Sequence, residues 1–193
     1  MELTILHLYP DTMSLYGEYA NIAVLRRHLE AMGVTVNLVK VTAEDVPDFT
    51  NADLIYMGAG TEGTQAVLLG LTHHVQALRE ALDRGCLLLF TGNAMETLGR
   101  SVTDAQGQVW GGLGLADFTT VETDKRVPGD VIATPTLWET PVVGFMNKCS
   151  TTSGITMPLF SQLPMGFGND AEHGPEGYAV GNILATHLTG PVL

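Results

Sequence analysis

Positive charge is scarce in this sequence of 193 residues, in which nine lysine and arginine residues stand against 21 aspartate and glutamate residues. The formal net charge is −12, and no basic run is long enough to follow a phosphate backbone. We therefore expect neither nucleic acid nor an anionic membrane surface as a partner.

Cysteine is also scarce: the chain has only Cys86 and Cys149, which are far apart in the sequence and form no CxxC motif. This usage predicts neither a disulfide framework nor a zinc site, and each cysteine is expected to be a reduced, buried small side chain. Long apolar runs are missing, and the first residues, MELTILHLYPD, show neither a basic segment before the apolar run nor a small-residue cleavage site. We expect a cytoplasmic protein without a membrane partner.

The composition, 45% hydrophobic and 16% charged, suits one compact domain, predicted over residues 1–193. Apolar segments at 3–10, 34–41, 52–58 and 86–92 read as strands. Residues 16–33 predict an amphipathic helix with Ile22, Leu25, Leu29 and Met32 near one face, and 67–84 predicts helical material broken near GLTHH.

Strands that alternate with helices indicate the α/β class, with a largely parallel sheet flanked by helices and ligand sites at the carboxyl ends of the strands. After Gly99 the chain consists of short β-prone pieces punctuated by glycine and proline. This β-rich C-terminal half predicts a peripheral hairpin or an antiparallel extension.

A glycine-rich turn, GAGTEG at Gly58–Gly63, matches GxGxxG directly after a predicted strand. A dinucleotide site is not favoured, because the turn follows the third strand and the expected ribose-binding acid falls near Glu80 or Asp83, inside a helix. The alternative is a turn that aims backbone N–H groups at a developing negative charge.

Other polar residues carry weaker signals. His73, His74 and His173 lack a partner at ligand spacing, so we predict no metal site. Asp11 and Glu18 form a polar patch after the first strand, which is either a solvated helix-capping surface or part of a site.

The segment LLLFTGNAMETLG, residues 87–99, is an apolar run that stops at Thr-Gly-Asn before a helix-like stretch. Hydrolases and amidotransferases raise their nucleophile on such a strand-to-helix turn, where the helix N-terminus also stabilises an anion. The tip of this turn is Gly92 or its neighbours.

Several segments, in the right order along nearly the whole chain, resemble the triad-type, class I glutamine amidotransferases. The resembled branch holds the glutaminase subunit of lipid II isoglutaminyl synthase and the amidotransferase domain of cobyric acid synthase. MGAGTEGTQ resembles the GGGQDxEQ turn of that branch, with Gly58, Gly60, Glu62 and Gln65 retained. The other matching segments are LHLYPDTMSLYGEYANIAVLRRHLEAMGV with the opening of the subunit, GGLGLADFTTVET with GLGLLDxxT, RVPGD with RxxGN, VVGFMNKCSTTSG with VGFENHxGxT, GFGNDAEHGPEG with GxGNN and a later EG, and ILATHLTGPVL with IGTYLHGPLL.

The resemblance implies a flavodoxin-like α/β fold, but it also marks two losses. The elbow of the family reads CGGYQLLG, and alignment on Leu98 and Gly99 puts Gly92 where the nucleophilic cysteine stands. The family's YLHGP carries the general-base histidine, and HLTGP has Thr189 in that place. Gly92 cannot attack and Thr189 cannot act as a base near neutral pH, and losing either group costs about a millionfold in a comparable hydrolase.

Weak substitutes for the catalytic pair are Thr91, His187 and Glu96. Thr91 is an unactivated hydroxyl next to the elbow tip, and His187 would share a face with Thr189, roughly 7 Å away, if ILATHL is a strand. Glu96 takes the family's glutamine position and is either a surface or capping carboxylate or an acid near the pocket.

The two cysteines are poorer substitutes for the missing thiol. Cys86 begins the strand that ends at the elbow, which puts it roughly 20 Å from Gly92. The position of Cys149 relative to the pocket stays open.

Three functions follow from this pattern. The first is a catalytically degenerate subunit that scaffolds or regulates an ATP-dependent, Mur-ligase-like synthetase, the partner that the resemblance implies. The second is an active amidotransferase of the lipid II isoglutaminyl synthase or cobyric acid synthase type with displaced catalytic residues. The third is a binding protein for a small amino-acid-like amide or carboxylate. We expect no cofactor, and the candidate ligand-binding residues are Gly58, Gly60, Gln65, Asn93 and Arg126.

Overall fold

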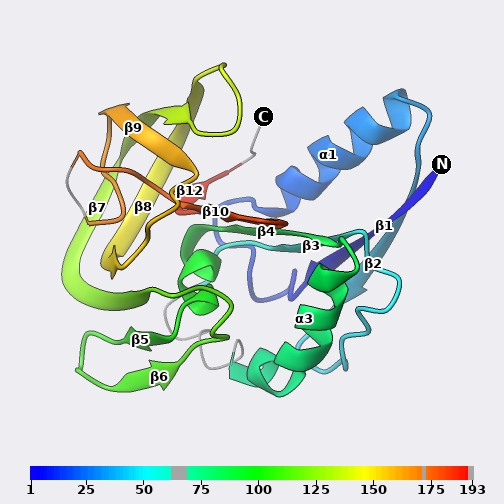
Figure 1. Cartoon of the computed structure of the whole chain (residues 1–193), viewed down its shortest axis with the longest axis horizontal. Coiled ribbons are helices and arrows are strands. Elements are labelled where there is room, and N and C mark those ends of the chain that lie inside the picture. Colours follow the sequence, from blue (N-terminus) through cyan, green and yellow to red (C-terminus); the bar gives the residue numbers. More distant parts are fainter. Residues whose placement is uncertain (62–68, 171–172, 191–193) are drawn as a thin grey trace.

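The computed structural model describes residues 1–61, 69–170 and 173–190. Two sheets form its framework (Figure 1). The chain builds most of the first sheet, then the second, and returns to the first near its end. The predicted α/β class with a largely parallel sheet and a β-rich C-terminal half is confirmed.

The first sheet has the strand order β10-β11-β4-β3-β1-β2. Its strands are β1 (Glu2–Leu8), β2 (Thr35–Val41), β3 (Leu54–Met57), β4 (Leu87–Thr91), β10 (Tyr178–Val180) and β11 (Ile183–Thr186). All neighbouring pairs are parallel except β10 with β11. The first four strands lie where the apolar segments predicted them, and their carboxyl ends meet at one edge.

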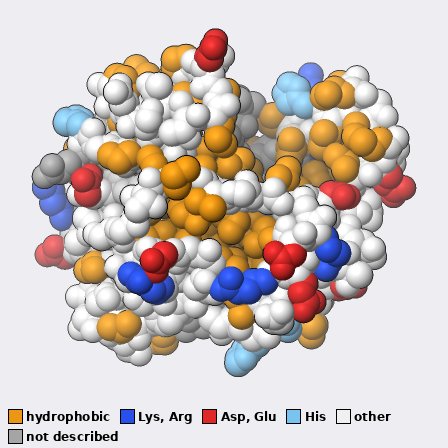
Figure 2. Space-filling view, viewed as in Figure 1, with side chains coloured by type: hydrophobic (Ala, Val, Ile, Leu, Met, Phe, Trp, Pro, Cys, Tyr) orange, Lys and Arg blue, Asp and Glu red, His pale blue; other side chains and the backbone are white. Residues whose placement is uncertain are grey.

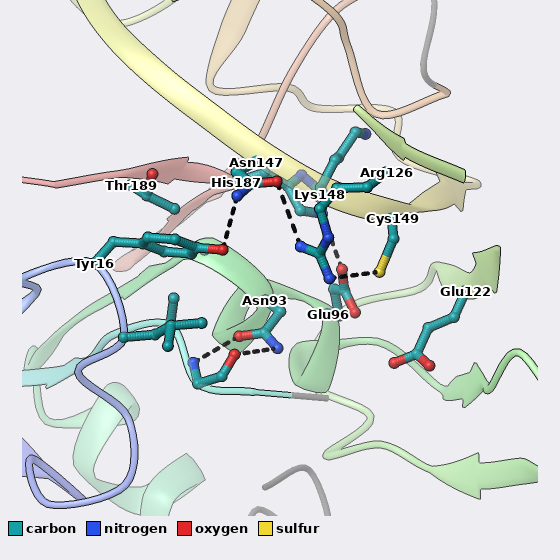
Figure 3. Close-up of a pocket in the computed structure, with 14 residues that line it drawn as sticks. Tyr16, Asn93, Glu96, Glu122, Arg126, Asn147, Lys148, Cys149, His187 and Thr189 are labelled. Carbon is teal, nitrogen blue, oxygen red and sulfur yellow. Dashed lines mark hydrogen bonds and ion pairs between the residues drawn. The ribbon is translucent and has the colours of Figure 1, made fainter. Parts of the chain in front are cut away.

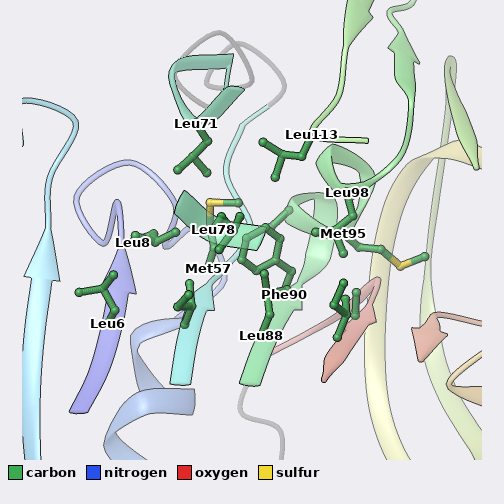
Figure 4. Close-up of a cluster of buried hydrophobic side chains, with 14 of the residues drawn as sticks. Leu6, Leu8, Met57, Leu71, Leu78, Leu88, Phe90, Met95, Leu98 and Leu113 are labelled. Carbon is green, nitrogen blue, oxygen red and sulfur yellow. The ribbon is translucent and has the colours of Figure 1, made fainter. Parts of the chain in front are cut away.

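Helices cover both faces of this sheet. Helix α1 (Tyr19–Ala31) packs its apolar side chains on Ile5 and Tyr56, whereas the segment η2 (Leu69–His74) and helix α3 (Val75–Asp83) cover the other face. Alternate strand residues point to the two faces, and Figure 4 shows the larger cluster around Leu88 and Phe90. Met32 was wrongly assigned to the buried helix face: it caps the helix and is 77% exposed.

The second sheet is larger than the predicted hairpin. It has the order β12-β8-β7-β5-β6, with β9 beside β7. Its strands are β5 (Ser101–Thr103), β6 (Val109–Gly111), β7 (Thr119–Pro135), β8 (Val142–Ser153), β9 (Phe160–Met165) and β12 (Leu188–Thr189). The expectation of short pieces was wrong because β7 runs through Pro128 and Gly129, which follow a bulge in its pairing with β8 between Glu122 and Val127.

The last passage of the chain from the first sheet to the second takes a single residue. Strand β11 ends at Thr186 beside β4, and β12 begins at Leu188 beside β8, so His187 alone links them. The segment ILATHL is therefore two strands in different sheets, and the condition for His187 and Thr189 to share one strand face is not met.

Apolar side chains gather over the middle of the face shown in Figure 2, and charged side chains lie mainly around its margin. Within the ranges described above, no helix is long and apolar enough to cross a membrane.

Candidate functional site

The turn between β4 and the 3₁₀ helix η3 (Gly92–Leu98) has the form of a nucleophile elbow without a nucleophile. Gly92 has φ +62°, in the left-handed region, and is buried. A Cβ atom built on it would lie 2.4 Å from Ala59 Cβ and 3.5 Å from Thr189 Cγ2. The structure thus brings Gly92 and Thr189 together, and it fills the space for a side chain at residue 92 with the methyl group of Ala59.

The glycine-rich turn after β3 is held by its neighbour across the elbow. The Gly60 N–H donates to Asn93 Oδ1 at 2.9 Å, and Asn93 Nδ2 donates back to the Gly60 carbonyl at 3.1 Å (Figure 3). Gly58 is needed for close approach, because a Cβ there would lie 2.4 Å from Glu18 Cβ. The Gly60 N–H is therefore already satisfied by Asn93 rather than directed at a ligand. Glu62 and Gln65 lie outside the described residues.

A buried hydrogen-bond network lies behind the elbow. The Thr91 hydroxyl donates to Glu18 Oε2 at 2.8 Å and lies 2.9 Å from the Tyr56 hydroxyl. Asn21 Nδ2 donates to the same carboxylate at 3.1 Å, and burial raises the pKa of Glu18. Glu18 is fully buried, so the solvated-surface interpretation was wrong for Glu18, whereas Asp11 is exposed and fits it. Thr91 is absent from the residues that line the pocket below.

A small pocket lies between the elbow and the second sheet (Figure 3). Its volume is about 20 Å³, measured as the space open to the centre of a water molecule, which is room for about one water. The lining residues come from the β1–α1 loop, the turn after β3, η3, strands of the second sheet and the link between β11 and β12. They are Leu15, Tyr16, Ala59, Gly60, Gly92, Asn93, Glu96, Glu122, Arg126, Asn147, Lys148, Cys149, His187 and Thr189.

His187 is held between two buried carboxylates at this pocket. Its Nδ1 lies 3.1 Å from Glu176 Oε1, which also accepts the His187 backbone N–H at 2.7 Å. Its Nε2 lies 3.6 Å from Glu96 Oε1, an ion-pair separation beyond hydrogen-bond distance. Glu96 accepts a 2.5 Å hydrogen bond from Ser150 Oγ and is 2% exposed. The interpretation of Glu96 as a surface or capping carboxylate was wrong.

Burial and the neighbouring charges act in opposite directions on the pKa values of His187 and Lys148. Burial and the Lys148 ammonium lower the pKa of His187, but the contacts with Glu176 and Glu96 outweigh them and leave it raised. Burial lowers the pKa of Lys148, against the charges of Glu176, Glu96 and Asp170. Lys148 Nζ donates to the carbonyls of Gly168 and Asn169. Together these groups form a buried polar cluster contributed by η3, β8, the segment before β10 and the link between β11 and β12.

The pocket rim is more open. Arg126 is exposed and donates to Asn147 Oδ1 at 3.4 Å, and its Nη2 lies 3.8 Å from Cys149 Sγ. Asn147 in turn donates to the Tyr16 hydroxyl at 2.9 Å. Cys149 is half-buried and lines the pocket, so the prediction of a buried residue was wrong here.

Cys86 is buried as predicted, and burial raises its pKa to about 11. Its thiol is therefore protonated and unreactive near neutral pH.

The remaining histidines lie elsewhere. His73 lies in the last turn of η2, which ends at His74. His73 is exposed, as is His173, whose ring stacks on Phe167 with centroids 5.9 Å apart. In the part of the chain that the structure describes, no three His, Cys, Asp or Glu residues are grouped as they would be around a metal ion.

Several residues of the site were missed from the sequence, among them Tyr16, Asn147, Lys148 and Glu176. The motif matches did contain a signal, since Tyr16 lies in the Leu-Tyr-Gly of the opening, Asn147 in VGFMNKCS and Glu176 in the Glu-Gly pair. What the motifs lacked was a reason to place these segments at one pocket, and the fold supplies it by bringing β8 and the β1–α1 loop to the elbow.

Comparison with known proteins identifies the family of the chain. Residues 4–193 match the model of the CobB/CobQ-like glutamine amidotransferase domain. The subunit GatD of the glutamine-hydrolysing lipid II isoglutaminyl synthase of Staphylococcus aureus (strain N315) is 30% identical over 193 residues, covering 100% of this chain and 79% of the relative. The same subunit of Streptococcus pneumoniae (strain ATCC BAA-255 / R6) is 28% identical over 200 residues, covering 100% of this chain and 75% of the relative.

Among solved structures, PurLQS of Thermotoga maritima superposes with a TM-score of 0.55 at 15% identity, covering 98% of this chain and 88% of that one, which supports the fold alone. The family match and the full-length relatives carry the assignment further. The chain therefore belongs to the CobB/CobQ-like glutamine amidotransferase domain family.

Proposed function

We propose that this chain is a catalytically inactive member of its family, a subunit that scaffolds or regulates an ATP-dependent, Mur-ligase-like synthetase. One observation carries the loss of activity: Gly92 stands at the tip of the elbow, and Ala59 Cβ occupies the space of a side chain there. A thioester with glutamine needs a thiolate at this tip and a base beside it, and the neighbouring position is Thr189, whose hydroxyl donates to the Phe145 carbonyl at 3.3 Å.

The backbone arrangement supports the same proposal. Oxyanion stabilisation depends on N–H groups that are free to meet the developing charge. The Gly60 N–H is engaged by Asn93, and the pocket holds about 20 Å³. A glutamine side chain does not fit this space without movement of the lining residues.

Ammonia release from glutamine tests the loss of activity. We expect no turnover above the uncatalysed background from the purified chain, with or without its partner, and full turnover from the S. aureus GatD relative in its own complex as the assay control. Turnover that persists in a Gly92→Ala variant and stops in a His187→Gln variant would replace this proposal with the displaced-residue enzyme.

The displaced-residue enzyme has one geometric point in its favour, the placement of His187 between Glu176 and Glu96 at the pocket. Against it, the two hydroxyls nearest to Gly92 in the chain and in space are both engaged: Thr91 with Glu18 and Tyr56, and Thr189 with the Phe145 carbonyl. His187 thus has a partner acid, but neither of these hydroxyls is free to serve as its nucleophile.

The partner is proposed from the relatives, which are named as subunits of lipid II isoglutaminyl synthase. Co-expression of this chain with the Mur-ligase-like protein of the same organism, followed by affinity purification through a tag on the ligase, tests the association. We expect a stoichiometric complex by size-exclusion chromatography. Separate elution of the two proteins at micromolar concentration would count against the subunit role without affecting the expected inactivity.

The same purified chain can be used to test the alternative function, a binding protein for a small amide or carboxylate. A binding protein for glutamine or glutamate requires a measurable heat or a rise in melting temperature with those ligands, and no product. The tight pocket leads us to expect neither.

A further inference from the structure

A second hollow lies away from the elbow, between α1 and the strands β1 and β2. Its volume is about 430 Å³, measured as for the first pocket, and sites of roughly 300–1,000 Å³ accommodate small molecules. It adjoins the carboxyl ends of two parallel strands, the edge of an α/β sheet where ligands generally bind. Its residues take no part in the elbow pocket.

One residue that lines this hollow, His7, has a buried ring nitrogen without a hydrogen-bond partner among the described residues. His7 and Lys40 are register partners near the ends of β1 and β2, and both line the hollow. His7 is 1% exposed, and its Nε2 has no hydrogen-bond partner in any described segment. Buried polar atoms are nearly always hydrogen-bonded, so an orphaned one calls for an explanation. Burial, with the charge of Lys40, lowers the pKa of His7 to about 4, which leaves a neutral ring able to donate or accept at Nε2.

Cations surround this atom. Arg26, Arg27 and Lys40 line the hollow, and they are three of the nine lysine and arginine residues of a chain with net charge −12. Arg26 is paired with Glu30 at 2.7 Å, and Glu30 is the one acidic residue in the lining. Throughout the described ranges, Arg27 and Lys40 have neither a hydrogen bond nor an ion pair through their side chains. The hollow therefore holds a surplus of two positive charges on an otherwise acidic protein.

We propose that this hollow binds a small molecule that carries a phosphate group. The surplus charge matches a dianion, and guanidinium and ammonium groups are the usual phosphate donors in proteins. The His7 imidazole satisfies its Nε2 on the bound molecule, while Tyr19, Ile22 and Leu38 supply apolar surface for its organic part. The site is independent of the elbow, so it stands or falls separately from the catalytic inactivity.

Calorimetric titration tests this site with pyrophosphate, AMP and glucose 6-phosphate as phosphate-bearing probes, and with adenosine and glucose as their unphosphorylated counterparts. We expect heat from at least one phosphate-bearing probe, none from its counterpart, and movement of the His7 imidazole resonance during the same titration. The absence of binding by all three phosphate-bearing probes at millimolar concentration would overturn the proposal, as would binding that leaves the His7 resonance unmoved.

A matched pair of double variants separates a built site from general charge attraction. Arg27→Gln with Lys40→Gln removes two exposed cations of the hollow, and we expect binding to weaken by at least about tenfold, because each charge-assisted hydrogen bond contributes appreciably. Arg100→Gln with Lys125→Gln changes the net charge equally at exposed positions outside the hollow, and we expect binding to be retained. Equal weakening in both double variants would contradict the site.

Discussion

At the scale of single residues, Ala59 and Gly92 depend on each other, because the Ala59 methyl group occupies the space that a side chain at residue 92 would need. In the motif that this turn resembles, all three positions of the turn are glycine and the elbow carries cysteine. Here the middle position is Ala59, and its Cβ lies 2.4 Å from where a Cβ of residue 92 would be. Compared with that motif, this chain has a side chain at residue 59 and none at residue 92.

Restoring a thiol is expected to destabilise the protein unless this volume is removed. Gly92→Cys adds a clash and places a side chain at φ +62°, and we expect a loss of about 1–3 kcal/mol in the free energy of unfolding, the usual cost of overpacking. Combining it with Ala59→Gly is expected to recover much of that loss, which urea unfolding of the two single variants and the double variant measures as a coupling energy. Additive effects would show that the two positions do not compete for one space.

His7 predicts a loss of stability in acid. Its pKa is about 4 in the folded protein against an ordinary 6.5, so the unfolded chain binds the proton more readily. The stability that His7 contributes is complete above pH 6.5 and falls as the pH drops toward 4, by up to about 3 kcal/mol. We expect His7→Phe, measured by urea unfolding from pH 7 to pH 4, to lose less stability over this window than the unaltered protein. Parallel curves would contradict the assignment.

At the scale of elements, the first half of the fold could be predicted because local patterns decide it. Alternation and apolar runs located β1 to β4, and the break predicted near GLTHH coincides with η2, the 3₁₀ helix that directly precedes α3. The second sheet could not be predicted, because Pro128 and Gly129 normally end a strand and here lie beyond a bulge that long-range pairing with β8 stabilises. Similarly, burial of Glu18 depends on Tyr56 and Thr91, partners distant in sequence.

Asn93 joins two elements, the start of η3 and the turn after β3. Its amide makes two hydrogen bonds with the Gly60 backbone, so Asn93→Ala is expected to cost about 1–3 kcal/mol of stability. We also expect faster hydrogen exchange at the Gly60 amide, measured by NMR, than in the unaltered protein. Unchanged exchange at Gly60 would show that another group holds the turn.

At the scale of the whole molecule, a buried polar cluster joins the two sheets where an apolar seam could have done so. Glu96 belongs to η3, Ser150 and Lys148 to β8, and His187 to the crossing between β11 and β12. Sequence motifs identified His187 and Glu96 as candidates, but they could not place them beside Glu176, because that contact depends on how the sheets meet. Buried charges of this kind stabilise only while every partner is present.

The cluster predicts an alkaline effect opposite to that of His7. The pKa of His187 is raised above its ordinary 6.5 in the folded state, so its contribution is complete below pH 6.5 and is lost as the pH rises through the folded value. We expect the unaltered protein to lose stability between pH 6.5 and pH 9 relative to a His187→Gln variant, measured by urea unfolding. A variant curve with the same slope would contradict the charged pairing with Glu176 and Glu96.

The close contact between Ala59 and Gly92 also affects the order in which substitutions could restore a thiol at the elbow. A substitution of Gly92 by cysteine alone places a thiol in space that Ala59 occupies. Such a variant would be less stable before it could gain any activity. Under the proposed loss of activity, a thiol at residue 92 is better tolerated once residue 59 has lost its methyl group, a change that by itself adds no catalytic group. A return to glutamine hydrolysis would then need at least two substitutions, in an order that favours residue 59 first.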